Sequence, residues 1–223
     1  HTGRPFTESN IGEVLATPDV LDLAEHTLVV FVSDNGPPFP GLKMTLYDRG
    51  AGPPLIVRWA ERIPGGVTLD HLTSTVDLMP TLLDAARLAP PAGVEGRSFL
   101  RTLLDPTRKA ARDAVFLEMT DHVAPLPMRA VRTAGWKYIV NLSDDPIGLD
   151  QLSDEAWAQR LAQLPDQPWT RPRVPEELYR LSVDPLEQRN LIGDPSAEAA
   201  YRGLRARLRA HMQATHDTAL AQV

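Results

Sequence analysis

The stretch VVFVSDNGPPFPGLKMTLYDRG, residues 29–50, decides how the first half of the chain folds. It passes from a β-branched apolar run to the pair Asp34-Asn35, and then into a proline-rich loop that carries Lys43. An Asn-Gly step after a strand is ordinarily a tight hairpin turn. Here prolines follow almost at once, and proline cannot donate to a strand ladder. We therefore expect no hairpin at this step, and no returning strand to pair with residues 28–32.

Composition limits the classes of protein that this chain can represent. It has 223 residues, of which 43% are hydrophobic, so a globular core is expected. The formal net charge of −6 gives no basic field, and we expect neither nucleic acid nor a membrane as partner. The absence of cysteine from the sequence excludes a disulfide, a thiolate metal site and a Cys nucleophile within this chain. No apolar run is long enough to span a bilayer, so the chain is expected to be soluble.

The first half has the pattern of an α/β layered domain. Residues 27–32 and 54–59 are continuous apolar runs, which are typical of strands covered on both faces of a parallel sheet. Residues 11–24 have helical spacing interrupted by Pro18, and residues 73–87 predict a helix with Asp77 as its N-cap. These elements predict that residues 1–112 form part of an α/β domain.

The second half has the pattern of antiparallel strands and a final helix. Short strands are predicted at 114–119, 128–133, 136–142 and within ELYRLSVDP, and the second and third form a hairpin. A short helix is expected at 152–163, inside a long irregular insertion. A helix is predicted from Ser196 to about Thr215, with Ser196 as its N-cap and one face formed by Tyr201, Leu204, Leu208, His211 and Met212. Residues 113–223 are thus expected to form a smaller α+β subdomain with an antiparallel sheet and a C-terminal helix.

The pair Asp34-Asn35 is a candidate metal site. In open α/β sheets, ligands bind beyond the carboxyl ends of parallel strands, where these two side chains would project. Carboxylate and amide oxygens suit a hard cation such as Ca²⁺ or Mg²⁺. Lys43 could then neutralise a developing oxyanion. The residues alone leave two alternatives open, a turn or capping role for Asp34 and a solvated surface position for Lys43.

Taken together, these segments resemble the sulfatase family of the alkaline-phosphatase-like superfamily. The resemblance rests on the apolar strand, Asp-Asn-Gly, a loop ending in Lys43, the motif Tyr47-Asp-x-Gly50 and then Pro-Leu-Ile-Val. The Pro-Phe-Pro insert at 38–40 is especially similar to N-sulfoglucosamine sulfohydrolases, the sulfamidases. Downstream, TSTVDLMPTLLDAA, the hairpin MRAVRTAGWKYIVNL and the closing motif ELYRLSVDPLEQRNL continue the resemblance in order.

The resemblance implies a fold and a chemistry. The fold would be part of an alkaline-phosphatase-like α/β/α sandwich followed by the smaller subdomain. A formylglycine, made from Cys or Ser in C/S-x-P-x-R, would attack the sulfur of a sulfuric ester or sulfamate. A divalent cation, usually calcium, would hold the sulfate oxygens. Asp34 and Asn35 match the later pair of cation ligands, and Lys43 matches the basic residue that contacts the sulfate. His122 lies in a segment that approaches the substrate pocket in sulfamidase-like enzymes, although an exposed loop position is the alternative.

The sequence also departs from the family pattern. The nucleophile motif and the two early metal-binding aspartates are absent from these 223 residues. We therefore expect a C-terminal portion of a sulfatase, inactive alone, that acts on a sulfated small molecule or sugar when complete. The alternatives are another alkaline-phosphatase-like hydrolase acting on phosphate esters, or a non-catalytic remnant of the fold.

Two further expectations follow from a missing half. The apolar strand at 27–32 would lack its neighbours, so self-association through exposed sheet surface is expected. A secreted or periplasmic location is expected only if the missing N-terminus carries a signal peptide.

Overall fold

A computed structural model describes residues 8–39, 41–122, 125–147, 159–160, 163 and 172–223. They form two compact units: unit 1 comprises His1–Ser33 and Pro54–Ala111, and unit 2 comprises Asp34–Pro53 and Arg112–Val223. The segment 34–53, expected within the first domain, therefore groups with the C-terminal part of the chain. The short helix expected at 152–163 falls largely outside the described residues.

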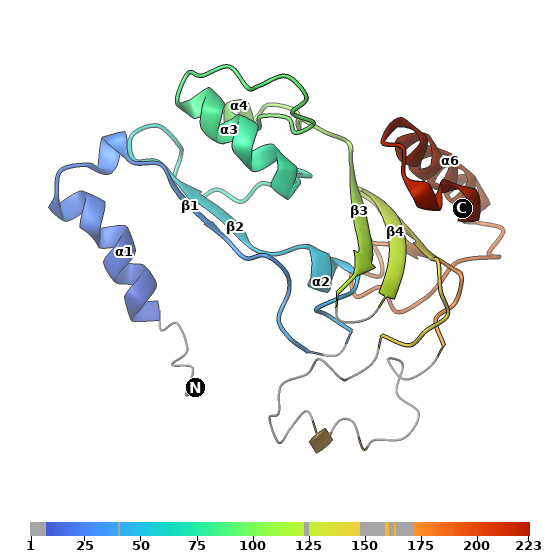
Figure 1. Ribbon diagram of the computed structural model, residues 1–223. Helices are drawn as coiled ribbons and strands as arrows, with labels where there is room; N and C mark the ends of the chain where they lie inside the picture. Colours follow the sequence, from blue (N-terminus) through green and yellow to red (C-terminus); the bar gives the residue numbers. More distant parts are fainter. Residues whose placement is uncertain (1–7, 40, 123–124, 148–158, 161–162, 164–171) are drawn as a thin grey trace. The chain divides into compact units, whose positions relative to one another are not determined.

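Unit 1 contains one pair of strands and several short helices (Figure 1). The helix expected at 11–24 spans residues 8–20 and includes Pro18. The helix expected at 73–87 is a 3-10 turn that continues as α3. The elements of unit 1 are α1 (Glu8–Val20), η1 (Ala24–His26), β1 (Val29–Val32), β2 (Leu55–Arg58), η2 (Thr75–Asp77), α3 (Leu78–Ala85) and α4 (Leu100–Leu104).

The strand pair of unit 1 corrects two expectations. Strands β1 and β2 are antiparallel, with Val29 opposite Arg58 and Val32 opposite Leu55. The parallel pairing expected for these runs is thus wrong for this pair, because a continuous apolar run predicts burial but not the direction of the neighbouring strand. The absence of a tight hairpin after β1 is confirmed, because the proline-rich loop follows the strand. The expected absence of a partner strand is wrong, because β2 pairs with β1 after the loop.

Asp77 holds the start of α3 in a way that differs from the expected N-cap. Its carboxylate accepts hydrogen bonds from the backbone N–H groups of Ser74 at 2.9 Å and Arg97 at 2.7 Å. The hydroxyl of Thr81 donates to the Asp77 carbonyl and accepts from the N–H of Phe99. The Asp77 side chain makes no capping hydrogen bond to α3. Its buried carboxylate instead connects the residue before η2 to residue 97, because both backbone donors lie outside α3.

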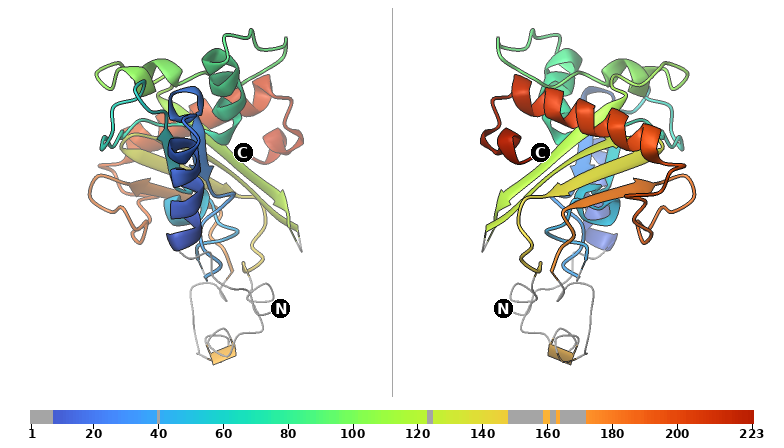
Figure 2. Two further views of the ribbon diagram at one scale, coloured as in Figure 1. Left: turned by 90° about the vertical axis from the view of Figure 1, so that its left-hand side faces the viewer. Right: turned by 90° about the vertical axis from the view of Figure 1, so that its right-hand side faces the viewer.

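Unit 2 is built on a four-stranded antiparallel sheet in the order β3-β4-β5-β6. The predicted strands and hairpin are confirmed, because β4 and β5 pair from Met128–Asn141 to Arg132–Lys137. Helix α6 lies across one face of this sheet (Figure 2). The elements are α2 (Asp48–Ala51), β3 (Ala114–Asp121), β4 (Pro125–Thr133), β5 (Trp136–Asn141), β6 (Glu176–Arg180), α6 (Glu198–Ala214) and η4 (Thr218–Gln222).

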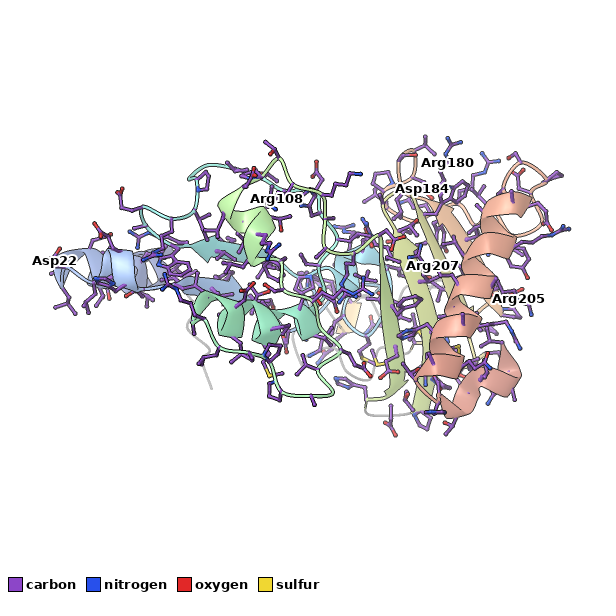
Figure 3. The ribbon with its side chains drawn as sticks, turned by 90° about the horizontal axis from the view of Figure 1, so that it is seen from above. Asp22, Arg108, Arg180, Asp184, Arg205 and Arg207 are labelled. Atoms are coloured by element: carbon purple, nitrogen blue, oxygen red, sulfur yellow. The ribbon has the colours of Figure 1, made fainter. Side chains whose placement is uncertain are left out.

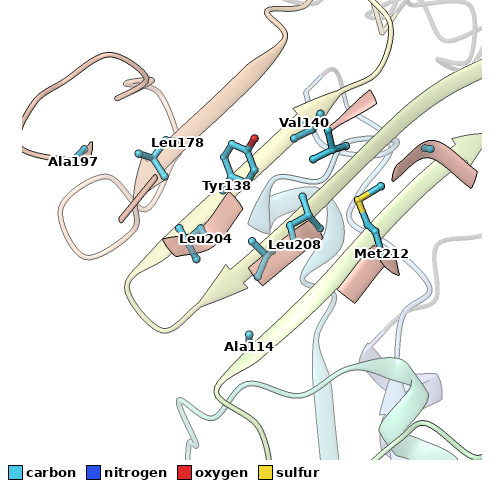
Figure 4. Close-up of a cluster of buried hydrophobic side chains, with 11 residues drawn as sticks. Ala114, Tyr138, Val140, Leu178, Ala197, Leu204, Leu208 and Met212 are labelled. Atoms are coloured by element: carbon cyan, nitrogen blue, oxygen red, sulfur yellow. The ribbon is translucent and has the colours of Figure 1, made fainter. Parts of the chain in front are cut away.

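The face of the sheet under α6 forms the first hydrophobic cluster of unit 2. The predicted helix face is confirmed, since Leu204, Leu208 and Met212 are buried against the strands. The predicted N-cap is wrong: α6 begins at Glu198, and the Ser196 hydroxyl bonds to Asp194 instead. The labelled members of the cluster in Figure 4 are Ala114, Tyr138, Val140, Leu178, Ala197, Leu204, Leu208 and Met212.

The opposite face of the same sheet packs against the segment around residues 44–47. Successive side chains of a strand point to opposite faces, so alternate residues of β4 and β5 serve the two clusters. This second cluster contains Met44, Leu46, Leu126, Met128, Ala130, Ile139, Tyr179 and Leu181. The sheet therefore has apolar cover on both faces, from α6 on one and from the loop that carries Lys43 on the other.

Charged side chains frame the α6 face. Arg207 pairs with Asp113, the residue directly before β3, whereas Arg205 lies on another side of the helix (Figure 3). Arg129 forms a buried ion pair with Asp217, with its Nε 2.5 Å from Oδ2. Within the described residues, no helix has both the length and the apolarity needed to cross a bilayer.

We predict that Asp217→Asn strongly destabilises unit 2. The hydrogen bonds of Arg129 hold the pKa of Asp217 below its usual value. Because the folded pKa is lowered, the stabilisation is present above the pKa of the unfolded chain and is lost as the pH falls through the folded pKa. Removing one partner of a buried pair costs about 3–5 kcal/mol. Urea unfolding at pH 7 should show this loss, and the difference between the two proteins should shrink in acid.

The matched control for this experiment is Glu118→Gln. Glu118 lies 3.8 Å from the same Arg129 Nε, but its side chain is 75% exposed. An exposed pair contributes at most about 1 kcal/mol. Equal destabilisation by both substitutions would contradict the structural role assigned to Asp217.

Candidate functional site

The candidate cation ligands lie immediately after β1, at the start of the segment 34–53. Asp34 is exposed and Asn35 is half-buried. The N–H of Asn35 donates to Oδ1 of Asp34 at 3.0 Å, which orients the carboxylate beside the amide. The two oxygen-bearing side chains thus start this loop as neighbours with a fixed backbone relation.

Two glycines close the loop that begins with this pair. The N–H of Gly36 donates to the carbonyl of Gly50 at 2.7 Å. A Cβ at Gly36 would lie 2.0 Å from the carbonyl oxygen of Arg49, and one at Gly50 would lie 2.0 Å from that of Leu42. Only glycine permits backbones to approach this closely. We call this contact between Gly36 and Gly50 the glycine clasp.

Lys43 lies on the same loop, which folds back toward its own start. Its backbone N–H donates to the carbonyl of Pro37 at 3.3 Å. The loop therefore brings the backbone of Lys43 to a residue that lies two positions after Asn35. Met44, next in sequence, has a φ of 67°, which is unfavourable for a side chain of this size. Met44 is buried in the cluster on the sheet, and this packing holds the strained backbone beside Lys43.

The motif Tyr47-Asp48 anchors the loop to the sheet. The hydroxyl of Tyr47 donates to the carboxylate of Glu177 at 2.8 Å, and the same carboxylate accepts from Tyr179 and from Asn141. Burial, together with the nearby Glu177 charge, raises the pKa of the Tyr47 phenol far above its ordinary value. The phenol therefore stays protonated and remains a donor at any physiological pH.

Asp48 is held by two cations of the sheet. Lys137 Nζ lies 2.5 Å from Oδ1 of Asp48, and Arg132 Nη2 lies 3.0 Å from Oδ2. Burial acts to raise the pKa of Asp48, but hydrogen bonds from Arg132 and Lys137 outweigh it and hold the pKa below the ordinary value. Burial raises the pKa of Glu187, whose carboxylate also lies beside Lys137, and the lysine only partly offsets this.

The position of Lys137 in the sequence is itself a signal for this cluster. Lys137 stands in the middle of the apolar strand WKYIVNL, and a lysine there must be paired if it is buried. The closing motif also has a structural role. Asp184 accepts from the N–H groups of Gln188 and Arg189, and Asn190 accepts from the N–H of Leu178.

His122 occupies a different place from the other candidates. It is exposed directly after β3, and residues 123–124 that follow lie outside the described part of the chain. The structure therefore joins Asp34, Asn35 and Lys43 through one loop, and it places His122 at the end of a strand. The role of His122 toward substrate stays a prediction.

The donor chemistry of the pair fits a hard divalent cation. Asp34 and Asn35 offer carboxylate and amide oxygens, the ligand types that Ca²⁺ and Mg²⁺ take. Among the described residues, no group of three or more His, Cys, Asp or Glu side chains is placed to hold a metal ion. The pair thus supplies two donors of a coordination set that normally needs six to eight for Ca²⁺.

Comparisons with known proteins identify the family. A protein-family model described as N-sulphoglucosamine sulphohydrolase, C-terminal, matches residues 42–155, which is half of the chain and includes Lys43. The chain belongs to the sulfatase family. An ulvan-active sulfatase from Formosa agariphila is 30% identical over 227 residues, which cover 95% of this chain and 37% of that relative. Human N-sulphoglucosamine sulphohydrolase is 30% identical over 234 residues, which cover 94% of this chain and 46% of that enzyme.

A solved structure supports the sulfatase fold. A protein in complex with its substrate, D-glucosamine-2-N,6-O-disulfate, superposes with a TM-score of 0.72 at 23% identity, covering 94% of this chain and 39% of that one. The expected α/β, alkaline-phosphatase-like fold is thereby confirmed. The sulfatase chain spans less than half the length of the curated relatives described above.

We predict that Gly36→Ala and Gly50→Ala each disrupt the sulfatase loop. The added methyl group would overlap a backbone carbonyl, so the glycine clasp must open, at a cost of about 1–3 kcal/mol for overpacking. Hydrogen exchange of the Gly36 amide, which donates the hydrogen bond of the clasp, should accelerate in Gly50→Ala when it is measured by NMR.

Gly203→Ala on α6 is the control for this pair. A Cβ at Gly203 meets nothing within 4 Å, and alanine is favoured over glycine in a helix by up to about 1 kcal/mol. The control should therefore be neutral or stabilising. Unchanged exchange at Gly36 in Gly50→Ala would refute the clasp.

Proposed function

We propose that this chain carries the later half of the cation and sulfate site of a sulfatase that hydrolyses a sulfuric ester or sulfamate of a sugar. The observation that supports it is the single loop on which Asp34, Asn35 and Lys43 are held by the glycine clasp. The family match adds that the chain around Lys43 belongs to sulfatases.

Each residue of the loop has a separate proposed role. Asp34 and Asn35 would hold a divalent cation, Ca²⁺ or Mg²⁺, through their side-chain oxygens. When bound, such a cation supplies charge stabilisation to the sulfate oxygens. Lys43 would donate hydrogen bonds from its ammonium group to the sulfate, which neutralises charge as the S–O or S–N bond breaks. These residues would bind and orient the sulfate but would not attack it.

The attacking group would come from sequence that this chain does not contain. The sequence has no cysteine and no serine in the pattern S-x-P-x-R, so the formylglycine precursor has no candidate here. We propose that turnover needs this nucleophile and the remaining cation ligands together with the loop, and that these 223 residues alone are inactive.

The substrate class follows from the relatives. One solved neighbour holds a glucosamine carrying N- and O-sulfate groups as its substrate. The two curated relatives described above are named an ulvan-active sulfatase and an N-sulphoglucosamine sulphohydrolase. These names favour a sulfated sugar over a phosphate ester.

We predict that Asp34→Asn weakens calcium binding to the loop. In the wild-type chain, a Ca²⁺ titration should shift the NMR signals of Asn35 and Gly36, with a dissociation constant on the order of 1 mM or weaker, because two donors make an incomplete site. Asp34→Asn replaces the charged ligand and should weaken this response about tenfold. Asp121→Asn, an exposed aspartate at the end of β3, is the control and should leave the titration unchanged.

Two results would contradict this proposal. An identical titration in Asp34→Asn would remove the cation role of the pair. Turnover of an aryl sulfate by the purified 223-residue chain would overturn the claim that the nucleophile lies elsewhere.

We also propose that unit 1 associates with further copies of the chain through apolar surface. Phe31 and Ile56 are opposite each other in the β1–β2 pair and are 41% and 60% exposed. Large apolar patches at a surface mark association sites or aggregation liabilities. The other strongly exposed apolar side chains of unit 1 include Val14, Val20, Leu21, Val76 and Leu88.

We predict a sedimentation coefficient that rises with protein concentration in analytical ultracentrifugation. Ile56→Glu places a charge in this apolar surface and should reduce the association. Val183→Glu is the control, because Val183 is 72% exposed and belongs to unit 2 rather than to unit 1. A single monomeric species at high concentration would refute the proposal.

A further inference from the structure

A fully buried lysine contacts the loop of the proposed site from the middle of the sheet. Lys137 on β5 has no exposed surface, and its Nζ lies within 2.9 Å of three oxygen atoms. They are the carbonyl oxygen of Leu46 at 2.9 Å, Oδ1 of Asp48 at 2.5 Å and Oε1 of Glu187 at 2.9 Å. The contact with Leu46 is a hydrogen bond, and the two carboxylate oxygens are held as ion pairs.

Such an arrangement is poorly explained by stability alone. A buried ion pair is often no more stable than apolar side chains of similar volume, because desolvation offsets the attraction. The charge adds geometric specificity, because each charge-assisted contact of Lys137 specifies where its partner oxygen lies. The neighbours of Lys137 on the same face, such as Ile139, are apolar and would suffice for packing.

The acceptors show what is being positioned. Two of them, at Leu46 and Asp48, belong to the loop segment that leads into α2. The third, Glu187, also accepts from the backbone N–H of Asp48 at 2.6 Å. Lys137 and Glu187 together therefore bind both the backbone and the side chain of residues 46–48.

Residues 46–48, which Lys137 and Glu187 bind, are connected to the glycine clasp through α2. The N–H of Gly50 donates to the carbonyl of Tyr47 at 2.9 Å, within the segment that Lys137 binds. The carbonyl of Gly50 then accepts from Gly36, the residue directly after Asn35. Gly50 also lies against the carbonyl of Leu42, the residue directly before Lys43. A shift of residues 46–48 would thus move both ends of the proposed site.

We propose that Lys137, together with Glu187, is a positioning residue that sets the placement of Lys43 and of the Asp34-Asn35 pair. It does so by fixing residues 46–48 against the sheet, and it does not itself touch the sulfate or the cation. This inference rests on the proposed function for the ligand-binding role of the loop, whereas the mechanical link can be measured without any ligand.

The test compares two buried ion pairs on opposite faces of one sheet. Lys137→Met with Glu187→Gln removes both charges at once, so that neither is left buried without a partner. Arg129→Met with Asp217→Asn is the matched control, because this pair is also buried but lies on the α6 side. Hydrogen exchange is followed by NMR in the 223-residue chain at the amides of Gly36 and Gly50 in the loop and of Val131 in the sheet.

The expected result is a local loss of protection. In the Lys137/Glu187 variant, protection at Gly36 and Gly50 should fall about tenfold or more, the size expected for losing a charged hydrogen bond, while Val131 changes by less than about twofold. In the control, the loop should change no more than Val131. Equal changes in loop and sheet, or an unchanged loop, would overturn the proposal.

A second variant protects the test against failure to fold. Asp48→Asn keeps the Lys137–Glu187 pair and removes the charge of their partner on the loop, which also pairs with Arg132 and whose side chain is 33% exposed. It should reduce protection at Gly36 and Gly50 in the same direction by a smaller factor. Full protection in this variant would likewise overturn the proposal.

A ligand arm separates the two proposals. Titration with inorganic sulfate should shift the Lys43 amide signal of the wild-type chain, and the Lys137/Glu187 variant should need several-fold more sulfate for the same shift. Equal sulfate affinity in both proteins would overturn the positioning role. A wild-type Lys43 signal that ignores sulfate would overturn the proposed function of Lys43, and the exchange measurements would then decide the positioning role alone.

Discussion

The ammonium group of Lys137 is the constraint on which the structure of unit 2 depends. A sheet can bury a lysine at its centre only if acceptors are brought to it. Here the acceptors come from two segments far apart in sequence, residues 46–48 and Glu187. The four-stranded sheet therefore recruits a loop from the first quarter of the chain, and the loop that it recruits is the one that carries the candidate site.

The two faces of the sheet are stabilised by different means. The α6 face is held mainly by apolar packing from an amphipathic helix, with the ion pair of Arg129 at its border. The opposite face combines a smaller apolar cluster with a polar layer around Glu177 and Lys137. Apolar packing tolerates small shifts, whereas hydrogen bonds do not, so the face that carries the site is the one whose geometry is more narrowly specified.

Much of the fold could be predicted from local pattern, because local pattern reports burial. The hairpin of β4 and β5 and the buried face of α6 follow from alternation and helical spacing, and the structure has both. The direction of the β1–β2 pairing could not be predicted, since an apolar run does not specify which strand lies beside it. The N-cap of α6 was missed because Ser196 has a nearer partner in Asp194.

The residues of the candidate site also differ in how far they could be predicted from local pattern. Asp34, Asn35 and Lys43 could be proposed from a contiguous motif, and the motif also names the glycines that the clasp requires. The residues that anchor the loop could not be found in this way, because Lys137 and Glu187 lie about 90 and 140 positions beyond it and meet it only in the folded chain. Sequence patterns capture neighbours along the chain more readily than partners across the fold.

The register of the strand pair has one more consequence, for the entropy of the loop. Val32 and Leu55 are partners in the antiparallel pair, so the two ends of the connection that carries the site are held beside each other. Closing a flexible segment costs conformational entropy that grows slowly with its length. Once β1 and β2 have paired, that closure has already occurred, and the segment has only to order itself internally as it settles on the sheet.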